Sequence, residues 1–144
     1  MDTKEAVLLL IEASQQVRVF HWNTKSYAEH VALGSLYEAI DASADEIAET
    51  LIGLEDKRPV LSGTIQLSDH RGTDSVRTFL KALSMELEAF EGSTDVLNLR
   101  DDLLGKVHKT LYLLSLDGEE EEEGEEEGEE PTEKEQPPPK DQSE

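Results

Sequence analysis

Two histidines and two carboxylates in the first half of the chain could together bind a metal ion. His21 and His30 lie nine residues apart, and Asp45 and Glu49 follow at a spacing of four. Residues four apart share one face of an α-helix, with Cβ atoms about 5–6 Å apart, so the two carboxylates could share a metal ion. Imidazole and carboxylate are ligands suited to iron or zinc. The residue types and their spacing therefore indicate a site for one of these metals.

The acidic residues around this set have a simpler alternative explanation. Eight acidic residues and no lysine or arginine lie between Lys25 and Lys57, and Asp41, Asp45 and Glu49 follow one another at helical i,i+4 spacing. Like charges at this spacing destabilise a helix by about 0.2–0.5 kcal/mol per pair. A solvated acidic face, bases supplied by a neighbouring helix, or a bound cation would each account for the pattern. Charge alone leaves these three alternatives open.

Apolar residues at three- and four-residue spacing predict an all-α protein with four helices. Asp2 with Glu5 and Ser26 with Glu29 are capping-box signatures for the first two helix starts. His70 and His108 have no acidic neighbours at ligand spacing, so we assign them no role. The expected helices cover about 2–23, 26–54, 74–90 and 94–116, with one long connection at 55–73. Two helical hairpins joined by one long crossover between helices two and three form the topology of ferritin-like four-helix bundles.

The composition divides the chain into a folded domain and an acidic tail. Residues 117–144 contain 15 acidic residues, two lysines and no large apolar residue, so we expect a folded domain at 1–116 and a disordered tail at 117–144. The net charge of −21 argues against duplex DNA and favours a basic protein as a partner of the tail. The chain has no cysteine, and we recognise no secretory leader and no apolar run of membrane-spanning length. We therefore expect a cytoplasmic protein that does not bind membranes.

The sequence Phe20-His21-Trp22-Asn23, followed by His30 and by Asp45-x-x-x-Glu49, resembles the ferroxidase signature of the Dps-type miniferritins (DNA-binding proteins from starved cells). The resemblance extends over nearly all of residues 1–116, although only the His-Trp and Asp-x-x-x-Glu pieces are specific. Gly34 stands where members of that family often have another carboxylate. The lysine-rich terminal arms with which some members bind DNA are absent.

The resemblance implies a function, a ligand set and an assembly. His21 and His30 would come from one subunit, and Asp45 and Glu49 from a two-fold-related neighbour. The expected activity is ferroxidase activity, the oxidation of Fe(II) to Fe(III) by peroxide or oxygen at a non-haem iron site, with iron storage as a further possibility. The expected assembly is a homo-oligomer, a dodecamer built from two-fold dimers. The alternative is a ferritin-like structural or interaction protein with a vestigial site, which acts through its acidic tail.

Overall fold

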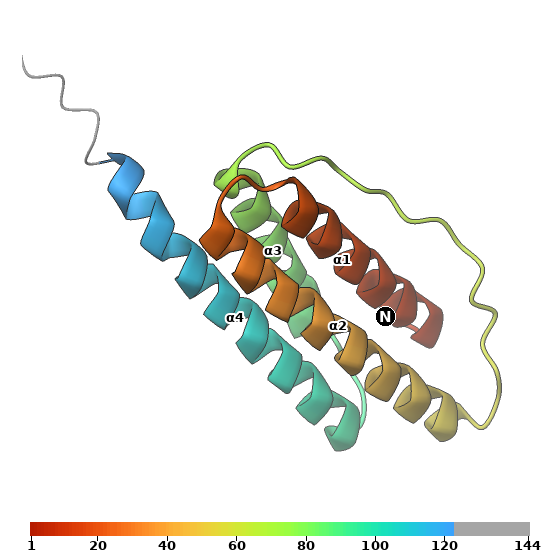
Figure 1. Cartoon of the computed structure of the whole chain (residues 1–144). Helices are drawn as coiled ribbons and strands as arrows, with labels where there is room; N and C mark the ends of the chain where they lie inside the picture. Colours follow the sequence, from red (N-terminus) through yellow and green to blue (C-terminus); the bar gives the residue numbers. More distant parts are fainter. Residues whose placement is uncertain (123–144) are drawn as a thin grey trace, which may run out of the picture.

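The protein folds into four α-helices joined by one long and two short connections (Figure 1). The computed structural model describes the backbone of residues 1–122 and the side chains of residues 1–116. Within the described residues there is no strand, and no helix is long and apolar enough to cross a membrane. The predicted all-α class is confirmed. The helices are α1 (Thr3–Asn23), α2 (Tyr27–Glu55), α3 (Thr73–Glu88) and α4 (Thr94–Glu122).

The helices begin where the sequence places capping residues. The carboxylate of Asp2 accepts a hydrogen bond from the backbone N–H of Glu5, and the Glu5 side chain accepts one from the N–H of Asp2, which completes the predicted capping box. The hydroxyl of Ser26 accepts from the N–H of Glu29 at 3.2 Å and caps α2. Glu29, however, turns its carboxylate into the protein interior.

The core is one apolar cluster to which all four helices contribute. Helix α2 packs against α1 and α4, and α3 packs mainly against α4. The buried residues of α1 recur every three or four positions, as the apolar spacing predicted. The fully buried side chains include Leu10, Leu33, Ile47, Leu80 and Leu103.

The long crossover, residues 56–72, returns along the length of the bundle, so that α3 starts at the same end of the molecule as α2 (Figure 1). Helices α2 and α3 therefore run in one direction, and α1 and α4 run in the opposite one.

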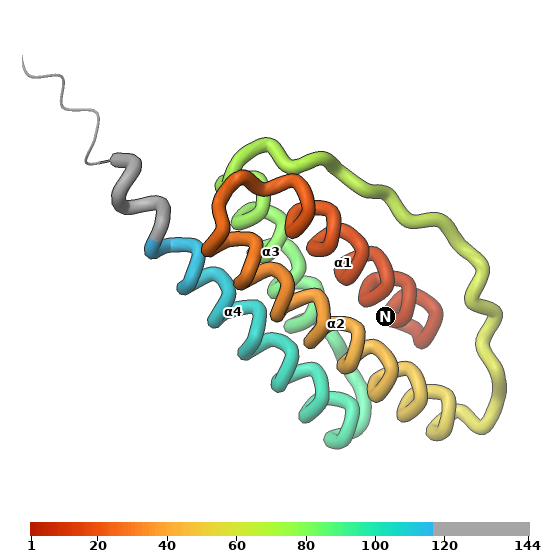
Figure 2. Tube along the Cα trace, viewed as in Figure 1, coloured from red at the N-terminus to blue at the C-terminus, as the bar shows by residue number. Residues whose placement is uncertain are grey.

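The crossover follows α1 (Figure 2). It is attached to this helix by hydrogen bonds. The buried side-chain amide of Gln16 donates to the carbonyl of Ser68 at 2.8 Å and accepts from its N–H at 2.6 Å. Near the end of α1, the Asn23 amide donates to the Asp69 carboxylate at 2.8 Å. That bond and one from the backbone N–H of His70 lower the pKa of Asp69. A segment without regular secondary structure is thus fixed in register with a helix.

Helix α4 continues past Leu116, where we expected the folded domain to end, as far as Glu122. The rest of the predicted disordered tail, residues 123–144, lies outside the residues that the structure describes.

Candidate metal centre

His21 and His30 meet where α1 ends and α2 begins. Their imidazole rings are stacked, with centroids 3.7 Å apart and planes 15° from parallel. The Nδ1 of His21 lies 2.6 Å from the backbone carbonyl oxygen of His30, and the Nδ1 of His30 lies 2.7 Å from that of His21. The predicted pair therefore comes together within one chain, with each histidine bonded to the backbone of the other.

These two hydrogen bonds determine which nitrogen of each ring is free. A carbonyl oxygen can only accept, so Nδ1 must carry the hydrogen in both rings. In the neutral imidazole, Nε2 is then left with an unshared electron pair. Neither Nε2 forms a hydrogen bond within the described part of the chain. Histidines that bind metals usually donate their other N–H to a carbonyl or carboxylate in this way, which fixes the ring and raises its basicity.

Residues of α2 form the surroundings of the His21 ring. A Cβ atom added to Gly34 would lie 2.9 Å from Cε1 and 3.2 Å from Nδ1 of His21, so the ring occupies the space that a side chain at position 34 would fill. The Tyr37 ring meets the His21 ring edge to face at 5.3 Å. The guanidinium of Arg18 covers the Tyr37 ring, with Cζ 4.5 Å from its centroid. The imidazole is thus held by packing as well as by hydrogen bonds.

The acidic face of α2 divides into a neutralised part and an unpaired part. Arg18 of α1 pairs with Asp41 at 3.1 Å, and the Ser14 hydroxyl also donates to this carboxylate. A neighbouring helix thus supplies the base for Asp41, which was one of the three alternatives. Asp45 and Glu49 are exposed, and neither takes part in an ion pair within the described residues. For these two, the solvated face and the bound cation remain open.

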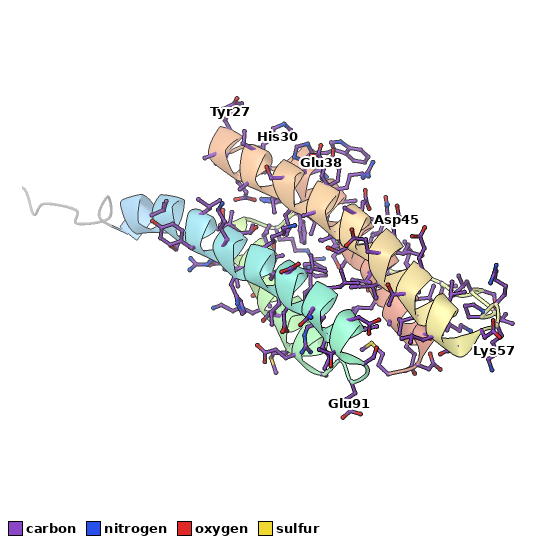
Figure 3. The ribbon with its side chains drawn as sticks, turned by 90° about the horizontal axis from the view of Figure 1, so that it is seen from below. Tyr27, His30, Glu38, Asp45, Lys57 and Glu91 are labelled. Carbon is purple, nitrogen blue, oxygen red and sulfur yellow. The ribbon has the colours of Figure 1, made fainter. Side chains whose placement is uncertain are left out.

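One chain does not bring the four predicted ligands together. His30 and Asp45 are fifteen residues apart on one helix, which corresponds to about 22 Å along its axis. Among the described residues, no three histidine or acidic side chains are grouped so that they could hold a metal ion. His30 and Asp45 do lie on the same side of α2, facing away from α4 (Figure 3).

The structure also contains a polar cluster that the sequence did not lead us to expect. Nε2 of His70 donates to the Glu29 carboxylate at 2.6 Å, and the Thr73 hydroxyl donates to its other oxygen at 2.7 Å. Nδ1 of His70 accepts from the N–H of Gly72 at 3.2 Å, so a neutral imidazole satisfies both contacts. Glu29 is only 2 % exposed and lies in the first turn of α2, where the helix dipole favours a negative charge.

We assigned His70 no role from the sequence because we saw no acidic neighbour at ligand spacing. Its partner in the structure is 41 residues away, and no local spacing connects the two. The only hint was the position of Glu29 in a capping box, which placed it near a helix start without showing that it turns inward. In the structure, His70 ties the end of the crossover to the first turn of α2.

Comparison with known sequences gives a family but no activity. No curated protein and no solved structure matches the chain. Residues 21–114 match the sequence model of DUF5856, which is described as a family of unknown function. The matched range contains His21, His30, Asp45 and Glu49 and covers well over half of the chain. The protein therefore belongs to the DUF5856 family.

Proposed function

We propose that this protein is a ferritin-like miniferritin that oxidises Fe(II) at a site formed between two copies of the chain. His21 and His30 of one copy and Asp45 and Glu49 of the other would be the ligands, and iron would be the substrate. The proposal rests on the resemblance of the His and Asp-x-x-x-Glu pieces to the Dps-type signature. The parallel course of α2 and α3, connected by a long crossover, is compatible with a ferritin-like topology.

The observation that carries the proposal is the histidine pair. The two imidazoles are stacked, each Nδ1–H is engaged with a carbonyl, and each Nε2 is free of hydrogen bonds within the described chain. The same two hydrogen bonds also hold the turn between α1 and α2, so what favours a metal is that they leave both Nε2 atoms available on adjacent rings. This arrangement suits the binding of a divalent transition metal.

The outward side of α2 suggests how two copies could complete the site. His30, Glu38 and Asp45 lie along this side (Figure 3). Glu38 is next to the midpoint between His30 and Asp45. A second copy packed antiparallel about a two-fold axis near Glu38 would bring His30 of each chain beside Asp45 of the other, because a two-fold contact pairs residues reciprocally. Each dimer would then have two equivalent sites.

The ligand set suits iron oxidation because it leaves coordination positions open. Imidazole and carboxylate would hold Fe(II), while the remaining positions stay accessible to the oxidant. Each Fe(II) loses one electron, and one molecule of hydrogen peroxide takes up two electrons and two protons to give two molecules of water. The unpaired charges of Asp45 and Glu49 would attract the cation and stabilise the Fe(III) product. Assembly of such dimers into a dodecamer is part of the proposal, on the strength of the resemblance alone.

The test is a mixing experiment with the full-length chain. His21→Ala removes one half of the proposed site, and Asp45→Asn with Glu49→Gln removes the other half, so each variant alone should lose Fe(II) oxidation. A mixture of unfolded variants that are refolded together should recover part of the activity, because some interfaces then combine two intact halves. Absorbance of Fe(III) under peroxide measures the rate. Binding is followed separately through the fluorescence of Trp22, the only tryptophan, which is exposed beside His21.

Matched controls distinguish the site from general charge effects. Glu46→Gln removes an exposed carboxylate from the same turn of α2, and His108→Ala removes an exposed histidine from α4. Both variants should oxidise Fe(II) like the unmutated protein. If the unmutated protein leaves Fe(II) oxidation at the buffer rate, the proposal fails, and a structural or interaction protein becomes the better explanation. If the mixture recovers nothing although each variant assembles, the site does not lie between copies.

A further inference from the structure

A groove separates the first half of α2 from the later part of α4, away from the histidine pair. Its volume is about 620 Å³, within the roughly 300–1,000 Å³ typical of small-molecule sites. The lining is predominantly apolar. Among the residues whose side chains are described, no histidine or acidic residue lines it, so it is separate from the proposed metal centre.

The groove exists because α2 presents small side chains to α4. Ala28, Ala32 and Ala39 recur along this side of the helix, and a buried leucine, Leu36, lies among them. Larger apolar side chains stand around the opening and are exposed to solvent. Tyr27, which is 82 % exposed, belongs to this group together with Val31, Leu113 and Leu116. These side chains and the alanines line one apolar groove, the kind of concave surface that ligand sites use.

Two lysines of α4 line the same groove. Lys106 and Lys109 are exposed, and neither forms an ion pair with any residue whose side chain is described. They are three residues apart and therefore lie on one side of α4. Residues 1–116 have a net charge of −8, so a pair of unpaired cations beside an apolar groove departs from the general character of the surface.

We propose that this groove binds a long-chain carboxylate, with the alkyl chain among the alanines of α2 and the carboxylate at Lys106 and Lys109. The alkyl chain would remove the exposed apolar surface from water, which stabilises the complex in proportion to the area covered. The charge of the head group is opposite to that of the two lysines. The α2 residues that line the groove extend from Tyr27 to Ala39, about 18 Å of helix, which suits an extended alkyl chain.

Two other occupants fit the groove less well. The acidic end of this chain could pair with the lysines, but it has no large apolar residue to fill the groove. A second copy of the chain could cover the apolar rim. The α2 residues that line the groove, however, include no acidic side chain that could pair with the two lysines of another copy. Acidic residues of α2 lie on its outward side instead (Figure 3). A molecule with one negative charge and a long apolar part matches both features at once.

The experiment is calorimetric titration of the full-length protein with dodecanoate, below the concentration at which it forms micelles. Dodecyltrimethylammonium, which has the same alkyl chain and the opposite charge, is titrated in parallel. We expect saturable binding of dodecanoate and clearly weaker binding of the cation. Ser35→Trp places a large side chain in the groove from an exposed position and should abolish binding. Circular dichroism checks that this variant keeps its helices.

Charge reversal provides a second variant that does not depend on filling the groove. Lys106→Glu with Lys109→Glu should weaken dodecanoate binding about tenfold, which corresponds to about 1.4 kcal/mol for the loss of two exposed charge contacts, and should reverse the preference between the two amphiphiles. Lys81→Glu, at an exposed site on α3, is the matched control and should bind dodecanoate normally.

Three results would overturn the proposal. The first is that the unmutated protein binds neither amphiphile, or binds both equally. The second is that Ser35→Trp, with its helices intact, binds dodecanoate as tightly as the unmutated protein. The third is that Ser35→Trp changes the mass of the assembly while the unmutated protein does not bind dodecanoate, in which case the groove is an interface between copies.

Discussion

At the scale of single residues, Gly34 determines where the His21 imidazole can lie. Glycine inside a helix is less favourable than alanine by about 0.8–1.0 kcal/mol. A Cβ atom here would approach the ring to 2.9 Å, which is too close for any side chain unless the imidazole moves. The residue that the resemblance marked as a missing carboxylate is therefore the residue that makes room for the stacked histidine pair.

We predict that Gly34→Ala weakens metal binding without destabilising the bundle. The ring of His21 must shift, which breaks its bond to the His30 carbonyl, while the gain in helix propensity offsets the loss of that contact. Titration with Fe(II) without oxidant, followed by Trp22 fluorescence, measures the first effect, and thermal unfolding measures the second.

Gly53→Ala is the matched control for Gly34→Ala. Gly53 lies in the same helix, and a Cβ atom there would meet nothing within 4 Å. This variant should raise the free energy of unfolding by up to about 1 kcal/mol and leave metal binding unchanged. Equal metal binding by the two variants would show that the position of the His21 ring does not matter for the metal.

At the scale of the elements, the crossover is held at its far end by the contact between His70 and Glu29. We predict that His70→Ala lowers the free energy of unfolding by about 2 kcal/mol, within the range for losing a hydrogen bond to a buried charged group. The reason is that the Glu29 carboxylate, 2 % exposed, would keep only the Thr73 hydroxyl as a side-chain partner. Urea unfolding at neutral pH measures the change.

His108→Ala is the comparison for this prediction, because His108 is exposed on α4. Its replacement should change stability by less than about 0.5 kcal/mol. Similar losses in the two variants would mean that the crossover end is held by something other than the buried carboxylate.

Local features of the sequence predicted the elements better than they predicted the contacts between them. The helix starts could be found because Asp2 and Ser26 act on residues three positions away. The long crossover followed from its glycines and proline and from the lack of helical spacing. Its attachment could not be found, because Gln16 and Ser68 are 52 residues apart and polar side chains give no periodic signal at that separation. The histidine pair could be predicted only in part. The spacing identified both residues, but the stacking of their rings depends on the geometry of the turn and on Gly34.

At the scale of the whole molecule, the proposed two-fold axis passes near Glu38, so two copies of this exposed carboxylate would approach each other. We predict that Glu38→Gln strengthens dimerisation at low salt and reduces its dependence on salt, because the like charges at the axis disappear. Sedimentation or single-particle mass measurement over a range of salt concentrations gives the dissociation constant.

Glu91→Gln serves as the control for Glu38→Gln. Glu91 is an exposed carboxylate in the connection between α3 and α4, on the other side of the molecule from the outward side of α2 (Figure 3). The Glu91→Gln substitution changes the net charge by the same amount as Glu38→Gln. It should leave the salt dependence of dimerisation as it is in the unmutated protein. If both substitutions strengthen dimerisation equally, the cause is the overall charge of the protein, and the two-fold axis does not lie near Glu38.

The way in which the crossover is attached divides it into a stretch of fixed length and a stretch whose length can vary. Gly63 passes so close to Leu8 of α1 that a Cβ atom would clash at 2.6 Å, and Ser68 and Asp69 are bonded to Gln16 and Asn23 further along the helix. An extra residue between these points would move every later partner out of register. Residues 57–62 form no such bonds to α1 within the described chain. Relatives of different length, or a foreign peptide grafted for display, would be accommodated in that six-residue stretch, at the end of the bundle opposite the turn between α1 and α2 (Figure 1).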